Sequence, residues 1–241
     1  MGVSGRRIRW FAAGAALLVA AFAVLAILNI PAMAAYACPA CFDLKRADAR
    51  LFVDADMTDD EVAAVMAAVA EARGRVRGFY GDFDKQPVLL VCGTAECDKR
   101  LGGKGAKARA YGSVFIRVSP AGRNATILAH ELAHIENHAR VGDFRSALGG
   151  VPAWFDEGIA VIVSRDPRYL ELDGDEVRCL VEPDGDLPTT ARGWSKAAGK
   201  QARPLYAMAA CKVAHWMDAN GGKDGLIATL DRLGEGGSFN D

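Results

Sequence analysis

The chain has 241 residues, of which 51% are hydrophobic and 24% charged, so it is long enough for one globular domain and is neither disordered nor collagen-like. The formal net charge is −1, and 26 basic and 30 acidic residues remain when the first 34 residues are set aside. A mildly acidic domain has no electrostatic reason to bind phosphates, which excludes a nucleic acid as the expected partner.

The amino terminus is typical of an exported protein. Three arginines within residues 6–9 precede an apolar run over residues 10–30, and an A-x-A pattern at residues 32–34 matches a signal-peptidase site. The run is long enough to span a bilayer, so an uncleaved signal anchor is favoured over a cleaved signal peptide, although both stay open. Either way, the arginines remain in the cytoplasm and the rest lies outside, in a single-pass membrane protein or in a periplasmic or secreted one.

The chain divides into three segments without internal repeats. Residues 1–34 are the signal anchor or signal peptide, residues 35–57 a juxtamembrane segment, and residues 58–241 one catalytic domain. The first expected elements are a short strand around residues 51–53, a helix from the capping box at Thr58 to about Gly78, a buried strand over residues 86–92, a surface loop over residues 102–107 and a strand over residues 113–118 at a sheet edge. Helices are expected next, over residues 125–140 and 152–164. An irregular stretch over residues 165–203 follows, and helices over residues 204–219 and 225–233 end the chain.

Cysteine usage agrees with export. The six cysteines are Cys38, Cys41, Cys92, Cys97, Cys179 and Cys211. An even number in an oxidising compartment predicts up to three disulfides. The preferred pairs are Cys92 with Cys97, which flank a short turn, and Cys179 with Cys211. Cys38 and Cys41 form a C-x-x-C, for which a structural disulfide is favoured over a thiol redox or metal site because no thioredoxin-like pattern follows.

The helix expected over residues 125–140 contains H-E-x-x-H as His130-Glu131-Leu132-Ala133-His134. Positions four apart on a helix are separated by about 40° around the axis and about 6 Å along it, so two imidazoles can converge on one tetrahedral metal. Glu131 lies where its carboxylate can reach a water at the metal, as a general base requires. This motif alone is only modestly specific, and two histidines on an ordinary helix remain the alternative.

A third ligand is expected from the next helix. Glu157 stands 23 residues after His134, which leaves enough chain for a turn and an antiparallel return. The helix is otherwise apolar, so a carboxylate near its start needs a partner, and a cation would supply one. Three protein ligands with a fourth position left for water make up the catalytic pattern of zinc.

Together the two helices resemble the gluzincin metallopeptidases, and in particular the bacterial peptidase MA-like domains. The family pattern is H-E-x-x-H followed about twenty residues later by W-x-x-E-G-x-A. The second part is matched here by Trp154, Glu157, Gly158 and Ala160, and the similarity covers about residues 110–240. The resemblance implies an α+β, zincin-like domain with a small mixed sheet, the H-E-x-x-H helix and a mainly helical carboxyl-terminal part.

The resemblance also implies one zinc ion per chain, held by His130, His134 and Glu157. The implied reaction is attack of a zinc-activated water, deprotonated by Glu131, on a peptide carbonyl. Tyr206 is the candidate donor to the oxyanion, because family members often have a tyrosine in a comparable place; a core tyrosine is the alternative.

Three more residues have both a functional and a structural interpretation. Asp156 either orients a ligand histidine or serves as a favourable acid at a helix N-terminus. His138 lies one turn further along the ligand face and is expected to be a surface histidine rather than a support for the ligands. His215, beside Trp216, is expected to pack rather than to act in catalysis.

The sequence therefore predicts an extracytoplasmic zinc peptidase acting on a peptide or protein, attached to the membrane through its N-terminal helix if that helix is uncleaved. One alternative is a non-proteolytic metal-binding module of the cell envelope, which would not need Glu131. Another is a thiol oxidoreductase that uses Cys38 and Cys41.

Overall fold

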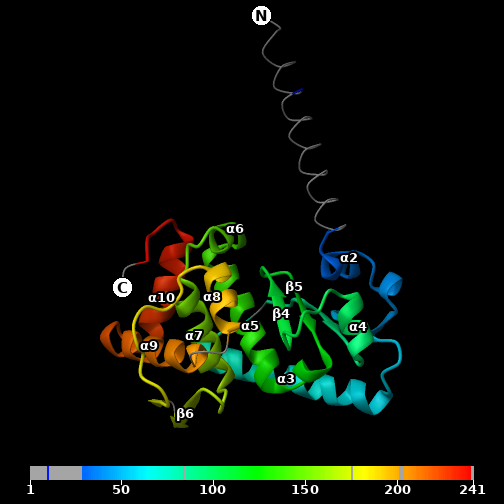
Figure 1. Ribbon diagram of the computed structural model, residues 1–241, viewed down its shortest axis with the longest axis horizontal. Helices are drawn as coiled ribbons and strands as arrows, with labels where there is room; N and C mark the ends of the chain where they lie inside the picture. The colour runs from blue at the N-terminus through cyan, green and yellow to red at the C-terminus, as the bar shows by residue number, and fades with distance from the viewer. Residues whose placement is uncertain (1–9, 11–28, 84, 175, 201–203, 240–241) are drawn as a thin grey trace, which may run out of the picture.

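The computed structural model describes residues 10, 29–83, 85–174, 176–200 and 204–239. A five-stranded mixed sheet forms one half of the molecule and a group of helices the other, so the fold is α+β as expected (Figure 1). The strands are β1 (Leu44–Asp48), β2 (Leu51–Asp54), β3 (Val88–Val91), β4 (Ala108–Tyr111), β5 (Phe115–Val118), β6 (Leu170–Asp173) and β7 (Glu176–Cys179). The α-helices are α2 (Pro31–Ala37), α3 (Asp59–Tyr80), α4 (Ala95–Arg100), α5 (Ala125–Val141), α6 (Asp143–Ala147), α7 (Ala153–Ser164), α8 (Ala191–Ala198), α9 (Leu205–Ala219) and α10 (Gly222–Gly234).

The sheet has the strand order β1-β2-β3-β5-β4. Strands β2, β3 and β5 run parallel, while β1 and β4 are antiparallel to their neighbours and form the two edges. The expectation of an edge strand over residues 113–118 is therefore wrong, because β5 is internal. The charged residue in that pattern, Arg117, does not face solvent: its side chain is buried and forms an ion pair with Asp98 of α4.

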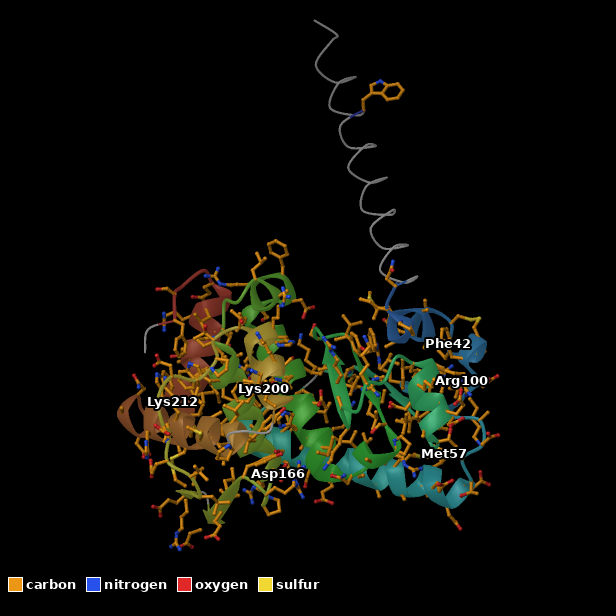
Figure 2. The ribbon with its side chains drawn as sticks, in the orientation of Figure 1. Phe42, Met57, Arg100, Asp166, Lys200 and Lys212 are labelled. Atoms are coloured by element: carbon orange, nitrogen blue, oxygen red, sulfur yellow. A yellow bond between two sulfur atoms is a disulfide. The ribbon has the colours of Figure 1, made fainter. Side chains whose placement is uncertain are left out.

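Apolar side chains lie on both faces of the sheet, which explains why β3 reads as a continuous apolar run. Leu89 and Val91 point into the main core, beneath α3 and α5. Leu90 points to the opposite face, into a smaller core that α2 and α4 cover. Figure 2 shows Phe42, Arg100 and Met57 at this sheet end of the molecule and Lys212 at the helical end.

Several short elements were not expected from the sequence. They are α2, β1, α4, β4, α6, the β6–β7 hairpin and α8. The prediction that residues 165–203 are irregular is therefore wrong in part. The strands β6 and β7 pair only with each other in the described part of the chain, and α8 is held at its start by Thr190, whose hydroxyl accepts from the Gly193 N–H at 3.1 Å. The sequence did not predict the hairpin or α8, because residues 165–203 are rich in acidic residues, glycine and proline, a composition typical of irregular segments.

The helical half is built around α7, which packs between α5 and α9. Almost every residue of α7 is buried, as its apolar sequence requires. Gly158 marks the crossing of α7 and α9: a Cβ added there would lie 2.4 Å from the Ala209 carbonyl oxygen. The absence of a side chain at Gly158 therefore lets α9 approach the start of α7 closely, next to Glu157.

All six cysteines form disulfides: Cys38–Cys41, Cys92–Cys97 and Cys179–Cys211. These are the predicted pairs. Three disulfides in a chain of this size are typical of an oxidising, extracytoplasmic compartment.

The predicted membrane segment over residues 10–30 lies, apart from its ends, outside the described residues. Among the helices that the structure describes, none combines the length and the apolarity needed to cross a bilayer.

Candidate metal centre

Helix α5 presents both histidines of the H-E-x-x-H motif on one face. It begins at Asn124, whose side chain accepts a hydrogen bond from the Ile127 N–H at 3.1 Å, an N-cap that satisfies one free donor of the first turn. It ends at Gly142, whose φ of 90° favours glycine. Within it, the rings of His130 and His134 are 4.8 Å apart, and their Nε2 atoms are separated by 3.2 Å.

Glu157, in the second turn of α7, completes a triangle of ligand atoms. Its Oε2 lies 3.4 Å from Nε2 of His130 and 3.8 Å from Nε2 of His134. Ligands at about 2.0–2.1 Å from a tetrahedral zinc ion would be about 3.3 Å apart. The three observed separations are close to this value, so the donor set and its spacing fit a metal ion, and the group could hold one. This spacing does not by itself select zinc over other divalent metals.

A second layer of hydrogen bonds fixes His134. Its Nδ1 lies 2.8 Å from Oδ2 of Asp156, the residue before Glu157. The other oxygen of Asp156 accepts from Nδ2 of Asn137 at 2.8 Å, and Oδ1 of Asn137 accepts from the buried hydroxyl of Tyr80 at 2.6 Å. A carboxylate on Nδ1 orients the imidazole so that Nε2 is left to bind the metal. Asp156 therefore has the orienting position that the sequence left open.

The electrostatic environment of the centre favours a cation. Burial lowers the pKa of His134, but the carboxylates of Asp156, Glu157 and Glu131 outweigh burial and raise that pKa to about 10. Burial raises the pKa of Asp156, and the neighbouring His134 and His138 reverse this effect and hold it well below its usual value. A buried group of carboxylates that binds a proton this strongly is also a group that stabilises a metal ion.

Glu131, on the same helix as the two histidines, reaches the sheet. The residue is only 8% exposed, and its Oε2 accepts a hydrogen bond from the backbone N–H of Ala110 in β4 at 2.6 Å. It is not part of the ligand triangle. The edge strand thus holds this carboxylate near His134, whose pKa it helps to raise.

Tyr206 lies in the first turn of α9, with its ring 6.2 Å from that of His130. It stacks on Tyr169 at 5.1 Å and meets Trp194 edge-on at 5.3 Å. Burial and the charge of Glu157 raise the pKa of its hydroxyl, so at neutral pH the phenol keeps its proton. The close crossing of α7 and α9 places Tyr206 next to His130, a position that its local sequence does not predict.

The remaining histidines differ from their expectations. His138 is not a plain surface residue, since its Nε2 lies 3.5 Å from Asp156. His215 is more than half exposed rather than packed, and its Nε2 lies 3.8 Å from Sγ of Cys211 and from Glu182. The cluster of Cys179, Glu182, Cys211 and His215 has the composition of a metal site, but both of its sulfur atoms are joined in a disulfide.

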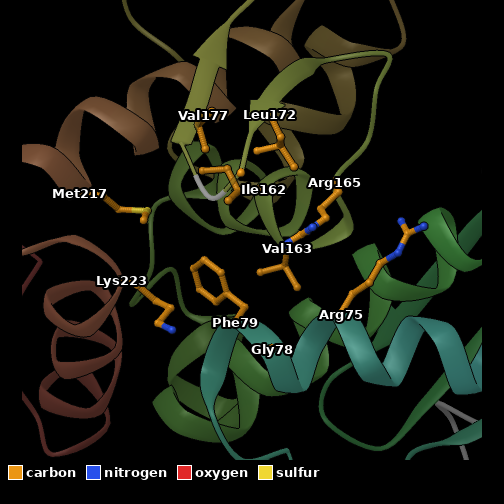
Figure 3. Close-up of a pocket in the computed structure, with 11 residues that line it drawn as sticks. Arg75, Gly78, Phe79, Ile162, Val163, Arg165, Leu172, Val177, Met217 and Lys223 are labelled. Atoms are coloured by element: carbon orange, nitrogen blue, oxygen red, sulfur yellow. The ribbon is translucent and has the colours of Figure 1, made fainter.

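A separate cavity of about 310 Å³ lies between α3, the end of α7 and the β6–β7 hairpin (Figure 3). Phe79, Ile162 and Met217 point into it, with Arg75 and Lys223 at its margin. It includes none of the residues of the metal centre, so it adds nothing to the chemistry there.

Sequence reasoning did not find Tyr80, Asn137 or the Ala110 N–H, all of which support the centre. The one usable signal was Asn137, a polar amide among the buried positions of α5. Compared with models of protein families, with curated proteins and with solved structures, the chain has no match.

Proposed function

We propose that the chain is a zinc-dependent peptidase of the gluzincin type, with His130, His134 and Glu157 as ligands and Glu131 as base. The observation that carries the proposal is the ligand triangle, with sides of 3.2, 3.4 and 3.8 Å, with a buried carboxylate beside it that is not a ligand. A module that only bound metal would have no use for that extra carboxylate.

A bound zinc ion would supply a Lewis acid that polarises a carbonyl and lowers the pKa of water. Glu131 accepts the proton of the attacking water and later returns it to the leaving amine. The protonated hydroxyl of Tyr206 donates to the carbonyl oxygen as negative charge develops on it. Asp156 holds His134 in the tautomer that the metal requires.

The edge strand β4 is the proposed platform for the substrate. The N–H and C=O of one strand residue point to the same side, and residues alternate between sides. The Ala110 N–H points to Glu131, so Ala108 and Ala110 direct their backbone groups toward the centre, away from β5. In the described part of the chain no strand pairs with that edge, and an extended peptide is the ligand that such an edge binds.

The test begins with metal content. The full chain, purified in detergent after exposure to zinc, should contain about one zinc per molecule by mass spectrometry, and His134→Ala should lose it. Absence of metal from the folded wild type would refute the proposal.

Glu131→Gln separates the two candidate functions. We expect this variant to keep its zinc and lose hydrolysis of a fluorogenic peptide library, because glutamine cannot accept the proton. A wild type that binds zinc but cleaves no member of the library would favour the envelope module, which the intact ligand triangle also permits. Unchanged hydrolysis by Glu131→Gln would remove Glu131 as the base.

A further inference from the structure

Exposed hydrophobic side chains gather at one edge of the domain. From residue 31 onward, the described part of the chain has six exposed large hydrophobic side chains, and four of them are Tyr36 of α2, Val114 of the β4–β5 turn, Phe144 of α6 and Leu148, which directly follows α6. Phe144 is 79% and Leu148 72% exposed, the highest values of the six. Single exposed apolar residues are ordinary, but a group of this kind marks an interaction surface.

Contacts between the three elements make this edge continuous. The ring of Tyr36 stacks on Phe115, the first residue of β5, at 4.9 Å. On the other side of the turn, Ser113 donates to Asp143 of α6 twice, from its N–H at 2.6 Å and its hydroxyl at 2.9 Å. Figures 1 and 2 show α2 and α6 at the same, upper edge of the molecule, whereas α3 lies at the opposite edge.

Helix α6 is built to present apolar groups and no charge at its tip. Phe144 and Leu148 are four positions apart, so they lie on the same side of this short helix. The one cation between them, Arg145, is turned inward and donates to the Gly237 carbonyl oxygen at 2.6 Å. Asp143 is occupied by the β4–β5 turn.

The apolar run over residues 10–30 identifies the occupant of this surface. It is about the length that spans a bilayer, and it enters the described fold at Ile30, directly before α2. As the uncleaved anchor that the sequence favours, this run would hold a lipid bilayer beside α2. A second apolar contact at α6 would add to such an anchor as a second membrane-binding element does.

We propose that the edge formed by α2, the β4–β5 turn and α6 lies on the bilayer surface, with Phe144 and Leu148 inserted at the boundary between headgroups and acyl chains. The domain is then held in one orientation by two points of attachment, the chain at Ile30 and the tip of α6. This inference does not depend on the peptidase activity.

The test uses the full chain in phosphatidylcholine bilayers, with Trp10 replaced by Phe to remove the tryptophan of the N-terminal segment. Phe144→Trp places a fluorophore at the tip of α6. Met66→Trp, at a 45% exposed position of α3, is the matched control at the opposite edge. Each emission is compared between ordinary lipid and lipid brominated near the headgroup end of one acyl chain, after subtraction of the three remaining tryptophans.

We expect a blue shift of the Phe144→Trp emission and its loss in brominated lipid, with the Met66→Trp emission unchanged in both respects. Unquenched emission from both variants would overturn the proposal. Quenching of both would also overturn it, because the domain would then have no fixed orientation. A blue shift of Phe144→Trp that bromine does not quench would show that α6 docks on a second protein copy instead of lipid.

Discussion

Replacement of Asp156 by Ala should weaken metal binding without removing a ligand. The substitution deletes the acceptor 2.8 Å from Nδ1 of His134 and leaves the Asn137 amide without that partner. A hydrogen bond to a charged group contributes about 1.5–3 kcal/mol, which corresponds to about a 10- to 100-fold loss of zinc affinity. Asp156→Asn should lose less, because its amide oxygen can still accept from the imidazole.

The assay is competition for zinc against a chromophoric chelator. Asp218→Asn, which removes a similar charge from an exposed position on α9, serves as the control and should bind zinc like the wild type. The hydrolysis rate at saturating zinc should fall much less than the affinity, because Asp156 acts through His134. Wild-type zinc affinity in a folded Asp156→Ala protein would refute the orienting role.

Three further predictions concern the stability of the fold. Gly158→Ala should lower the free energy of unfolding by about 1–3 kcal/mol, since its Cβ would lie 2.4 Å from a carbonyl oxygen. Gly74→Ala, whose Cβ would have no atom within 4 Å, should not destabilise the protein, and equal urea midpoints for the two variants would contradict the close helix crossing. Although burial lowers it, the surrounding carboxylates raise the pKa of His134 to about 10 in the folded, metal-free protein, against 6.5 for an ordinary histidine, so its stabilisation is complete below pH 6.5 and is lost as the pH rises towards 10. Urea unfolding of chelator-treated protein should therefore show lower stability at the upper end of that range, and a flat profile would contradict the shift. Replacement of Cys179 and Cys211 by Ser should lower the free energy of unfolding by up to about 4 kcal/mol, because a bond across 32 residues restricts the unfolded chain. Thermal denaturation measures the loss of stability, and an unchanged midpoint would show that the disulfide adds none.

The long periodic helices were predictable because local signals agree with their burial. The capping box at Thr58 and Glu61 is present, and α5, α7 and α9 begin and end within a few residues of their predicted bounds. Hydrophobic periodicity, capping and breaker residues are all local properties, so a single sequence contains them.

The short elements were not predictable, because tertiary contacts decide them. Arg117 made β5 resemble an edge strand, yet its buried ion pair with Asp98 comes from a helix that the sequence did not reveal. At the site, by contrast, the spacing of His130 and His134 correctly predicts that they converge, and Glu157 lies with them. The hydrogen bonds from Tyr80 and from Ala110 depend on how α3 and β4 meet α5, which no local pattern encodes.

The pairing of the cysteines has a consequence for oxidative folding. The six cysteines are bonded in consecutive pairs, the first with the second, the third with the fourth and the fifth with the sixth, with sequence separations of 3, 5 and 32 residues. Of the 15 ways to pair six cysteines, this is the one that results when thiols are joined in the order in which they emerge. A chain that is extruded amino end first can therefore be oxidised as it appears, since each bond can close before the next cysteine pair arrives. We therefore expect this connectivity to form without rearrangement by a disulfide isomerase.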